Sequence, residues 1–139
     1  MACTIRRVDY FHTTVRDQPG EAYKVLTTLQ ELGTNLLAFT AVPIGSDVTQ
    51  LTIFPEDSHL LLHQANDTGL KLDGPHPALL VQGDDKLGAL ATIHRDLYQA
   101  NINVSASSGV TDGQGSFGYV IYVRPEDFDR AVGAIGPCS

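Results

Sequence analysis

The sequence has no long apolar run and few basic side chains, and each shortage excludes a class of protein. No apolar stretch approaches the roughly 18 residues that a membrane-spanning helix needs. The 139 residues include 9 Lys and Arg against 16 Asp and Glu, which gives a formal net charge of −7. Sequence-independent nucleic-acid binding depends on basic patches, so we expect neither nucleic acid nor a membrane as a partner.

Cysteine is also scarce, with only Cys3 and Cys138, one near each end of the chain. Neither belongs to a Cys-x-x-Cys or Cys/His pattern, so no disulfide framework is expected. No apolar core of a signal peptide follows the basic pair Arg6 and Arg7. The sequence therefore predicts two reduced thiols and a cytoplasmic protein.

Familiar catalytic fingerprints are missing. The chain contains no G-x-S-x-G, P-loop or dinucleotide-binding motif, and no catalytic residue is assigned. The glycine-rich segment 112–118 is expected to join two antiparallel strands, so we interpret it as a long hairpin and not as a phosphate loop. His59 and His63 have the i, i+4 spacing of metal ligands on a helix, but no third ligand follows at a matching turn. We therefore expect no metal site and no cofactor.

An internal repeat is the main feature that the sequence does have. Three short segments of the first half return in the second half in the same order, two at an offset of 68 residues and one at 70. We attribute the two extra residues to a longer hairpin near Asp112 in the second copy. The matching pairs are Asp17–Gly20 with Asp85–Gly88, Asn35 with Asn103, and Pro55–Asp57 with Pro125–Asp127.

Apolar periodicity predicts the same series of elements in both copies: a strand, a helix, two strands and a second helix. Gly33 is placed to end the first helix in a left-handed conformation. The elements expected in the first copy are strand 8–15, helix 22–32, strands 35–42 and 48–54, a helix capped by Asp57 or Ser58, and strand 70–72. Those of the second copy are strand 79–82, helix 87–100, strands 102–107 and 119–123, and helix 125–135.

The order βαββαβ, repeated in tandem, predicts an α+β protein made of two ferredoxin-like units, each an antiparallel sheet with both helices on one face. We expect a first unit at 1–73, a linker at 74–77, where two prolines and a glycine gather, and a second unit at 78–139. The second copy lacks its last strand. This leaves a sheet edge that needs cover, so we expect a homodimer in which a second chain provides it.

The repeated turn before the helix is the strongest candidate for a binding site. A helix N-terminus exposes unpaired N–H groups and a partial positive charge, and Gly20 or Gly88 would let a small carboxylate approach them. Asp17 or Asp85 can receive an ammonium group, and the asparagine of each copy offers both a donor and an acceptor. The combination suits an α-amino acid, although Asp and Gly can equally serve as cap and turn alone.

On these segments the chain resembles two tandem ACT domains, the amino-acid-binding regulatory modules of phosphoglycerate dehydrogenase and aspartokinase. The resemblance implies a ferredoxin-like fold, sheets that pair side by side, and effectors held at the interface between two copies. It also implies, by position, ligand contacts from both turns and both strand-entry asparagines. These candidate residues are Asp17, Gln18, Pro19, Gly20, Glu21 and Asn35 in the first copy, and Asp85, Lys86, Leu87, Gly88, Ala89 and Asn103 in the second.

Together these features predict a non-catalytic regulatory or sensor protein that binds a small molecule, most simply an amino acid, between its units. The effector would act allosterically on the assembly of the protein itself or of a biosynthetic enzyme partner. Two alternatives stay open: a small ferredoxin-like enzyme with His12 or Asp85 as base, and a structural pairing module without a ligand. Because Val15 and Gly83 stand where some serine-binding members have histidine, the resemblance does not favour serine as the ligand.

Overall fold

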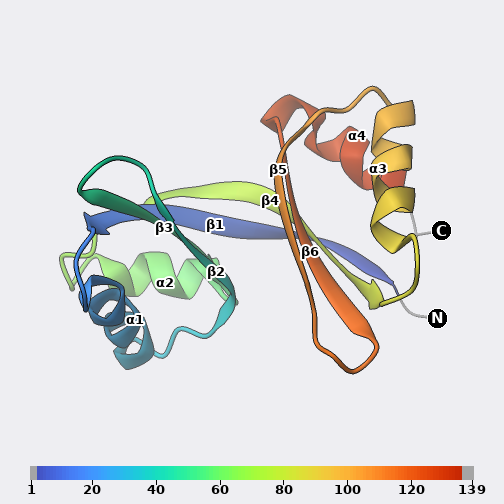
Figure 1. Cartoon of the computed structure of the whole chain (residues 1–139). Helices are drawn as coiled ribbons and strands as arrows, with labels where there is room; N and C mark the ends of the chain where they lie inside the picture. Colours follow the sequence, from blue (N-terminus) through green and yellow to red (C-terminus); the bar gives the residue numbers. More distant parts are fainter. Residues whose placement is uncertain (1–2, 136–139) are drawn as a thin grey trace. The chain divides into compact units, whose positions relative to one another are not determined.

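The computed structural model describes residues 3–135, which form six strands and four α-helices in two compact units (Figure 1). The N-terminal unit comprises residues 9–76. The C-terminal unit comprises the described residues up to Val8 together with those from Pro77 onward. Strands β1 (Thr4–Arg16) and β4 (Asp73–Asp84) each contribute residues to both units. The predicted α+β class and the antiparallel ferredoxin-like units are confirmed.

The N-terminal unit orders its strands β2-β3-β1-β4, and its two helices lie on one face of the sheet (Figure 1). Helices pack there because each turns an apolar stripe toward the sheet, with Leu29 and Leu61 almost fully buried against Phe11 and Ile53. The elements that complete this unit are α1 (Glu21–Glu31), β2 (Leu36–Pro43), β3 (Val48–Pro55) and α2 (Ser58–Ala65). Asp57 caps α2 by accepting a hydrogen bond from the Leu60 amide at 3.1 Å, as predicted.

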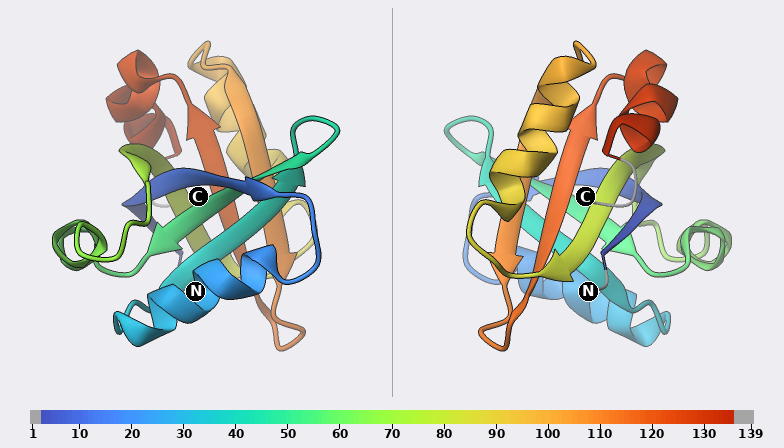
Figure 2. Two further views of the ribbon diagram at one scale, coloured as in Figure 1. Left: turned by 90° about the vertical axis from the view of Figure 1, so that its left-hand side faces the viewer. Right: turned by 90° about the vertical axis from the view of Figure 1, so that its right-hand side faces the viewer.

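The C-terminal unit orders its strands β5-β6-β4-β1, again with both helices on one face (Figure 2). Its core joins Leu97 and Ile135 of the helices to Leu79 and Ile121 of the sheet. The elements are α3 (Ala89–Gln99), β5 (Val104–Thr111), β6 (Ser116–Val123), a 3-10 turn η1 (Pro125–Asp127) and α4 (Phe128–Ile135). Across the described residues, no helix is both long and apolar enough to span a membrane.

The two units pair their strands in the same register, at a constant offset of 68 residues. Phe39 lies opposite Ile53 and Ser107 opposite Ile121, and both ladders carry an irregularity at the same place. The turns also correspond, since Ile44 bonds to Val48 in one hairpin and Asp112 to Ser116 in the other. The prediction of a longer second hairpin is therefore wrong. The two extra residues lie after β6, where η1 precedes α4.

The fourth strand of the C-terminal unit is the first part of β1, residues Thr4–Val8, beside β4. Val8 is buried, and Ile5 and Cys3 pack on the core of this unit, with Cys3 next to Gly83. The expected gap at the sheet edge is thus filled by the same chain. Repeat matching missed this because the covering strand precedes both copies in the sequence.

The segment expected as a linker forms the start of β4, and residues 70–72, predicted as a strand, lie before it. Residues 73–76 are the edge strand of the N-terminal unit, where a proline is tolerated because one side of the strand needs no N–H donors. The unit boundaries accordingly differ from the expected 1–73 and 78–139. Cys3 is disulfide-bonded, so the prediction of two reduced thiols is wrong. Cys138 lies outside the described residues.

Helix ends follow the repeat as well. Gly33 has φ +74° and Asn101, 68 positions later, has φ +58°. Both positions need the left-handed region, which glycine adopts freely and asparagine tolerates. The residue that follows each of them donates back to the helix, Thr34 to Leu29 and Ile102 to Leu97, both at 2.9 Å. The predicted stop at Gly33 is confirmed.

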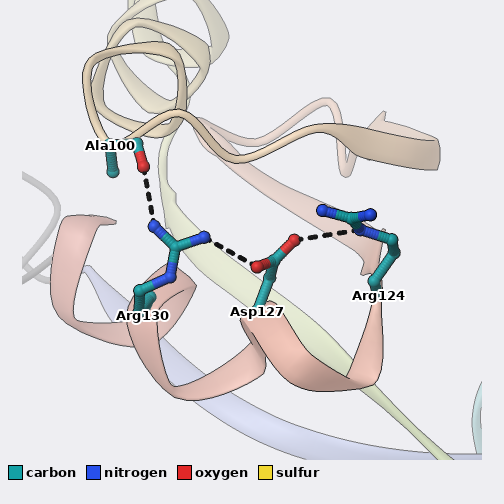
Figure 3. Close-up of polar contacts among 4 residues, drawn as sticks. All are labelled: Ala100, Arg124, Asp127 and Arg130. Atoms are coloured by element: carbon teal, nitrogen blue, oxygen red, sulfur yellow. Dashed lines mark hydrogen bonds and ion pairs between the residues drawn. The ribbon is translucent and has the colours of Figure 1, made fainter.

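A buried carboxylate joins η1, α4 and the end of α3 in the C-terminal unit (Figure 3). Asp127 is only 3% exposed and accepts hydrogen bonds from Arg130 at 2.7 Å and Arg124 at 3.2 Å. Arg130 also donates to the Ala100 carbonyl at 2.9 Å. The Arg130 hydrogen bond, with a smaller contribution from Arg124, holds the pKa of Asp127 below its ordinary value.

Candidate functional site

The turn between β4 and α3 is the part of the C-terminal unit that the repeat singles out. The Asp85 amide donates to the Gly115 carbonyl at 2.8 Å, which ties the turn to the β5–β6 hairpin. Gly88 has φ +84°, a left-handed conformation that favours glycine. Helix α3 then begins at Ala89, and among the described residues no side chain caps it. Its first turn therefore presents backbone amides and the positive end of the helix dipole.

An open pocket of about 620 Å³ lies at this turn. Most of its exposed lining is apolar, including the side chains of Leu87, which is fully exposed, and Val110, which is 74% exposed. The turn thus meets the far end of the β5–β6 hairpin. The lining consists of Asp85–Ala89, Leu90 and Ala91 of α3, Gly109–Thr111 of β5, and Phe117 and Gly118 of β6.

The strand residues of this lining are absent from the sequence prediction. The only feature of the sequence near these strand residues is the glycine-rich segment 112–118. In the structure this segment forms the β5–β6 hairpin. The Asp112 carboxylate accepts hydrogen bonds from the Gln114 amide at 2.7 Å and the Ser116 amide at 3.1 Å. These two hydrogen bonds lower the pKa of Asp112. They shape the hairpin that holds Gly118 at the pocket.

The corresponding turn of the N-terminal unit has the same backbone but a different first helical residue. Asp17 bonds to Asp47 at 2.8 Å, and Gly20 has φ +87°. Where α3 has Ala89, α1 has Glu21, whose carboxylate is 19% exposed and pairs with Lys24 at 2.9 Å. The first turn of α1 therefore has a negative charge near the positive end of the helix dipole, whereas the first turn of α3 has none. The other two predicted residues of this turn, Gln18 and Pro19, are exposed.

Comparisons with known proteins agree with the two-unit fold. No protein-family model and no curated protein matches the sequence. Among solved structures, protein BT0572 from Bacteroides thetaiotaomicron has a TM-score of 0.80 at 14% identity, over 94% of this chain and 88% of that one. The ligand-free regulatory subunit of aspartate kinase from Thermus thermophilus has a TM-score of 0.65 at 14% identity, over 97% and 95%. The chain has a tandem ACT-like fold.

The two asparagines do not lie with the turns of their own ACT-like units. Each follows the helix that the turn begins, and 11 helical residues at 1.5 Å each separate the two ends by about 16 Å. Asn35 is exposed and donates to the Glu56 carboxylate at 2.9 Å. Asn103 lines a different pocket, at the other end of α3. Within one unit, the turn and the asparagine therefore cannot hold the same small ligand.

The two candidate bases of the enzyme alternative belong to different units, His12 to the N-terminal unit and Asp85 to the C-terminal unit. His12 Nδ1 is 3.2 Å from Thr52 Oγ1, and its ring lies 5.9 Å from that of His76, which pairs with Asp73 at 3.1 Å. Tyr10 completes the cluster, its pKa raised by burial and by the nearby Asp73 carboxylate. The rings of Tyr10, His12 and His76 thus form one aromatic cluster.

The histidine pair at metal-ligand spacing lies on α2. His59 and His63 are both exposed. Within residues 3–135, no group of three His, Cys, Asp or Glu side chains is placed to hold a metal ion. The structure thus adds no third ligand to the pair.

Proposed function

We propose that this protein is a non-catalytic regulator or sensor that binds an amino acid at the turn pocket of its C-terminal unit. The observation that carries the proposal is the pocket of about 620 Å³ lined by all five predicted residues from Asp85 to Ala89. The ligand carboxylate accepts hydrogen bonds from the first amides of α3, and Asp85 receives the ammonium group. The apolar walls suit an aliphatic side chain.

The C-terminal unit is the binding unit because of one difference between the turns. Ala89 leaves the positive end of α3 without a carboxylate, whereas Glu21 supplies one to α1. The predicted contact from Asn103 then has to come from another unit or another chain, since it lies a helix length from its own turn. The resemblance to ACT domains, whose effectors lie between copies, supports the same arrangement.

The neighbours in fold support a regulatory role. The regulatory subunit of aspartate kinase has this fold over 95% of its length, and it is described as a subunit that regulates an enzyme. We therefore propose that this chain acts on a biosynthetic enzyme partner or on its own assembly. An effector can do so only through different affinities for two states. We also propose a homodimer, now through β2 and β5, the two edge strands of the sheet.

A thermal-shift screen with the twenty amino acids tests the binding site. One or a few aliphatic amino acids should raise the melting temperature, and Gly88→Val should abolish the rise because a side chain fills the approach to the amides. Gly20→Val is the matched control, since it introduces the same strain at φ +87° in the other unit. Sedimentation velocity on the same samples should show a dimer whose assembly changes with the active amino acid.

Each alternative predicts a different outcome of this screen. If no amino acid shifts the melting of the folded protein, or if Gly20→Val and Gly88→Val lose the shift equally, the proposed site is wrong. A structural pairing module would dimerise without any response to amino acids. A cytoplasmic location stays a prediction that cell fractionation tests; the disulfide at Cys3 removes one of its two arguments.

A further inference from the structure

The disulfide-bonded Cys3 lies next to one wall of the turn pocket. Cys3 belongs to the C-terminal unit and packs on its core, as Phe117 does. A Cβ at Gly83 would stand 3.3 Å from Cys3 Sγ and 3.4 Å from Phe117 Cε1, so both side chains lie over the same bare stretch of β4. Phe117 also lines the turn pocket, and Gly83 comes two residues before the turn residue Asp85.

The N-terminal unit shows that the fold does not require a cysteine at this place. At an offset of 68, Gly83 corresponds to Val15, whose side chain packs on the core of the N-terminal unit. In that unit the strand fills the position with its own side chain. In the C-terminal unit, glycine leaves the position to the sulfur of Cys3, which comes from the neighbouring strand segment. Since valine suffices for packing, packing alone gives no reason for the cysteine.

The disulfide bond ties down the strand that completes the C-terminal sheet. The sequence has one other cysteine, Cys138, so within one chain it is the only partner that Cys3 can have. A bond between positions so far apart strongly restricts the unfolded chain. Cys3 directly precedes Thr4–Val8, and the first residues of a chain are poorly ordered unless they are held. The bond therefore holds the beginning of this edge strand.

Thiol–disulfide exchange can open and close such a bond. Cys3 is only partly buried, so the bond is not sealed in the core. One molecule of a small thiol such as glutathione attacks the bond, forms a mixed disulfide and releases one protein thiol. A second molecule releases the other protein thiol and leaves as the small disulfide. Two electrons and two protons thus pass to the protein, and the small disulfide returns it to the oxidised form.

Reduction should change the wall of the turn pocket. Without the bond, Thr4–Val8 is a short strand held only by its hydrogen bonds and side-chain contacts, so it opens more often. Whenever it opens, the sulfur of Cys3 leaves its place over Gly83, and Phe117 loses a packing neighbour that glycine cannot replace. A pocket whose wall is not held in place binds its ligand more weakly, because binding must then also order the wall.

We propose that the Cys3 disulfide is a redox switch that regulates the turn pocket. The oxidised protein keeps Thr4–Val8 and Phe117 in place and binds the amino acid, and the reduced protein binds it more weakly. The inference rests on the proposed function, since it concerns the same site. Coupling between two equilibria is reciprocal. The bound amino acid must therefore make the disulfide harder to reduce, by the same factor by which reduction lowers the affinity.

Titration of the full chain with L-leucine tests the switch, with oxidised protein and with protein reduced by dithiothreitol. Leucine is the probe because its branched apolar side chain suits the pocket walls. We expect at least fivefold weaker binding to the reduced protein. Saturating leucine should shift the equilibrium with reduced and oxidised glutathione by the same factor. Cys138→Ser keeps the sulfur of Cys3 but cannot form the bond, so it should bind leucine as the reduced protein does, with or without dithiothreitol.

Two measurements without a ligand separate the switch from the amino-acid site. Reduction should speed hydrogen exchange of the protected amides in Thr4–Val8 at least tenfold and shift the NMR signals of the Phe117 ring. The protected amides of β3 provide the control, because this strand belongs wholly to the N-terminal unit.

Several results would overturn the switch. These are equal leucine affinities of the two folded forms, unchanged exchange in Thr4–Val8, or a dimer in non-reducing electrophoresis that dithiothreitol separates, since the bond would then join two chains. Leucine that binds neither form would count against the amino-acid site. The Phe117 ring signals then decide the switch, and signals that do not respond to reduction overturn it.

Discussion

The two units share one strand register, but the fourth strand of each sheet comes from a different part of the sequence. In one unit it follows the other elements of the unit, and in the other it precedes them. The N-terminal unit takes its fourth strand from residues 73–76, which follow its second helix. The C-terminal unit takes the same strand from Thr4–Val8, at the other end of the sequence. The edge of each sheet needs a further strand to cover it. That strand can come from any part of the sequence, because hydrogen bonding between strands depends only on their proximity and alignment.

The same comparison shows that one sequence motif, Pro-Glu-Asp, has different structural roles in the two units. Pro-Glu-Asp occurs in both units after the third strand of the sheet. Asp57 is exposed and caps α2, whereas Asp127 is 3% exposed and held by Arg124 and Arg130. In the C-terminal unit the Pro-Glu-Asp motif itself forms the 3-10 turn η1 before α4, and its aspartate lies in the interior and not at a helix cap. Identical tripeptides therefore have different roles where the backbone around them differs.

The largest loss of stability is expected for variants in the two hydrophobic cores. These variants test whether the two units unfold together. Leu29→Ala and Leu97→Ala change equivalent leucines, each 1% exposed, and each should lower the free energy of unfolding by about 2–5 kcal/mol. Because β1 and β4 supply both units, we expect each variant to shift one common transition in denaturant. Two transitions, with each variant moving only one of them, would show that the units fold separately.

A smaller effect is expected at the position where the ladders differ. Gly109→Ala places a methyl group 2.8 Å from the Tyr119 ring and should cost roughly 1–3 kcal/mol through forced repacking. The matched change Ala41→Gly should cost only about 0.5–1 kcal/mol, since it loses no contact of this kind. Chemical denaturation of both variants compares them. Equal stability losses would mean that the tyrosine ring does not need the glycine.

The smallest effects concern the two aspartates. Asp57→Ala should cost about 0.5–2 kcal/mol at neutral pH through loss of the helix cap. Asp127 differs in its pH dependence. Since its pKa is lowered on folding, its contribution is fully present above about pH 4 and is lost as the pH falls through the lowered value.

Asp127→Asn should therefore flatten the acid side of the stability–pH curve, measured by thermal melts between pH 2 and pH 7. Arg124 and Arg130 are more than half exposed, so solvent screens the pairs and keeps the effect at neutral pH modest. Asp57→Asn provides the control. An unchanged acid limb in Asp127→Asn would contradict the role assigned to the buried carboxylate.

Local chemistry predicted much of the fold correctly. Gly33 ends α1 because a left-handed residue is needed there, and Asp57 caps α2 because its side chain accepts a helix amide. Gly20 and Gly88 both have positive φ, because the residue before each helix is in the left-handed region that glycine adopts freely. The site was less predictable, because Gly109–Thr111 and Phe117 reach the turn pocket only through strand pairing, and nothing in their sequence points to it.

The sequence by itself determined the repeated unit, the order of its elements and the turns, since periodicity, glycine and capping residues act within a few positions of the chain. Tertiary structure alone decided that Thr4–Val8 completes the C-terminal sheet and that Asn103 lies away from its own turn. It also decided that the side chains of His94, Tyr119 and Ser107 are joined by hydrogen bonds. Those outcomes depend on which segments become neighbours in space. Repeats reveal shared backbone geometry, but a difference in side chains gains its meaning only from the neighbours that the fold supplies.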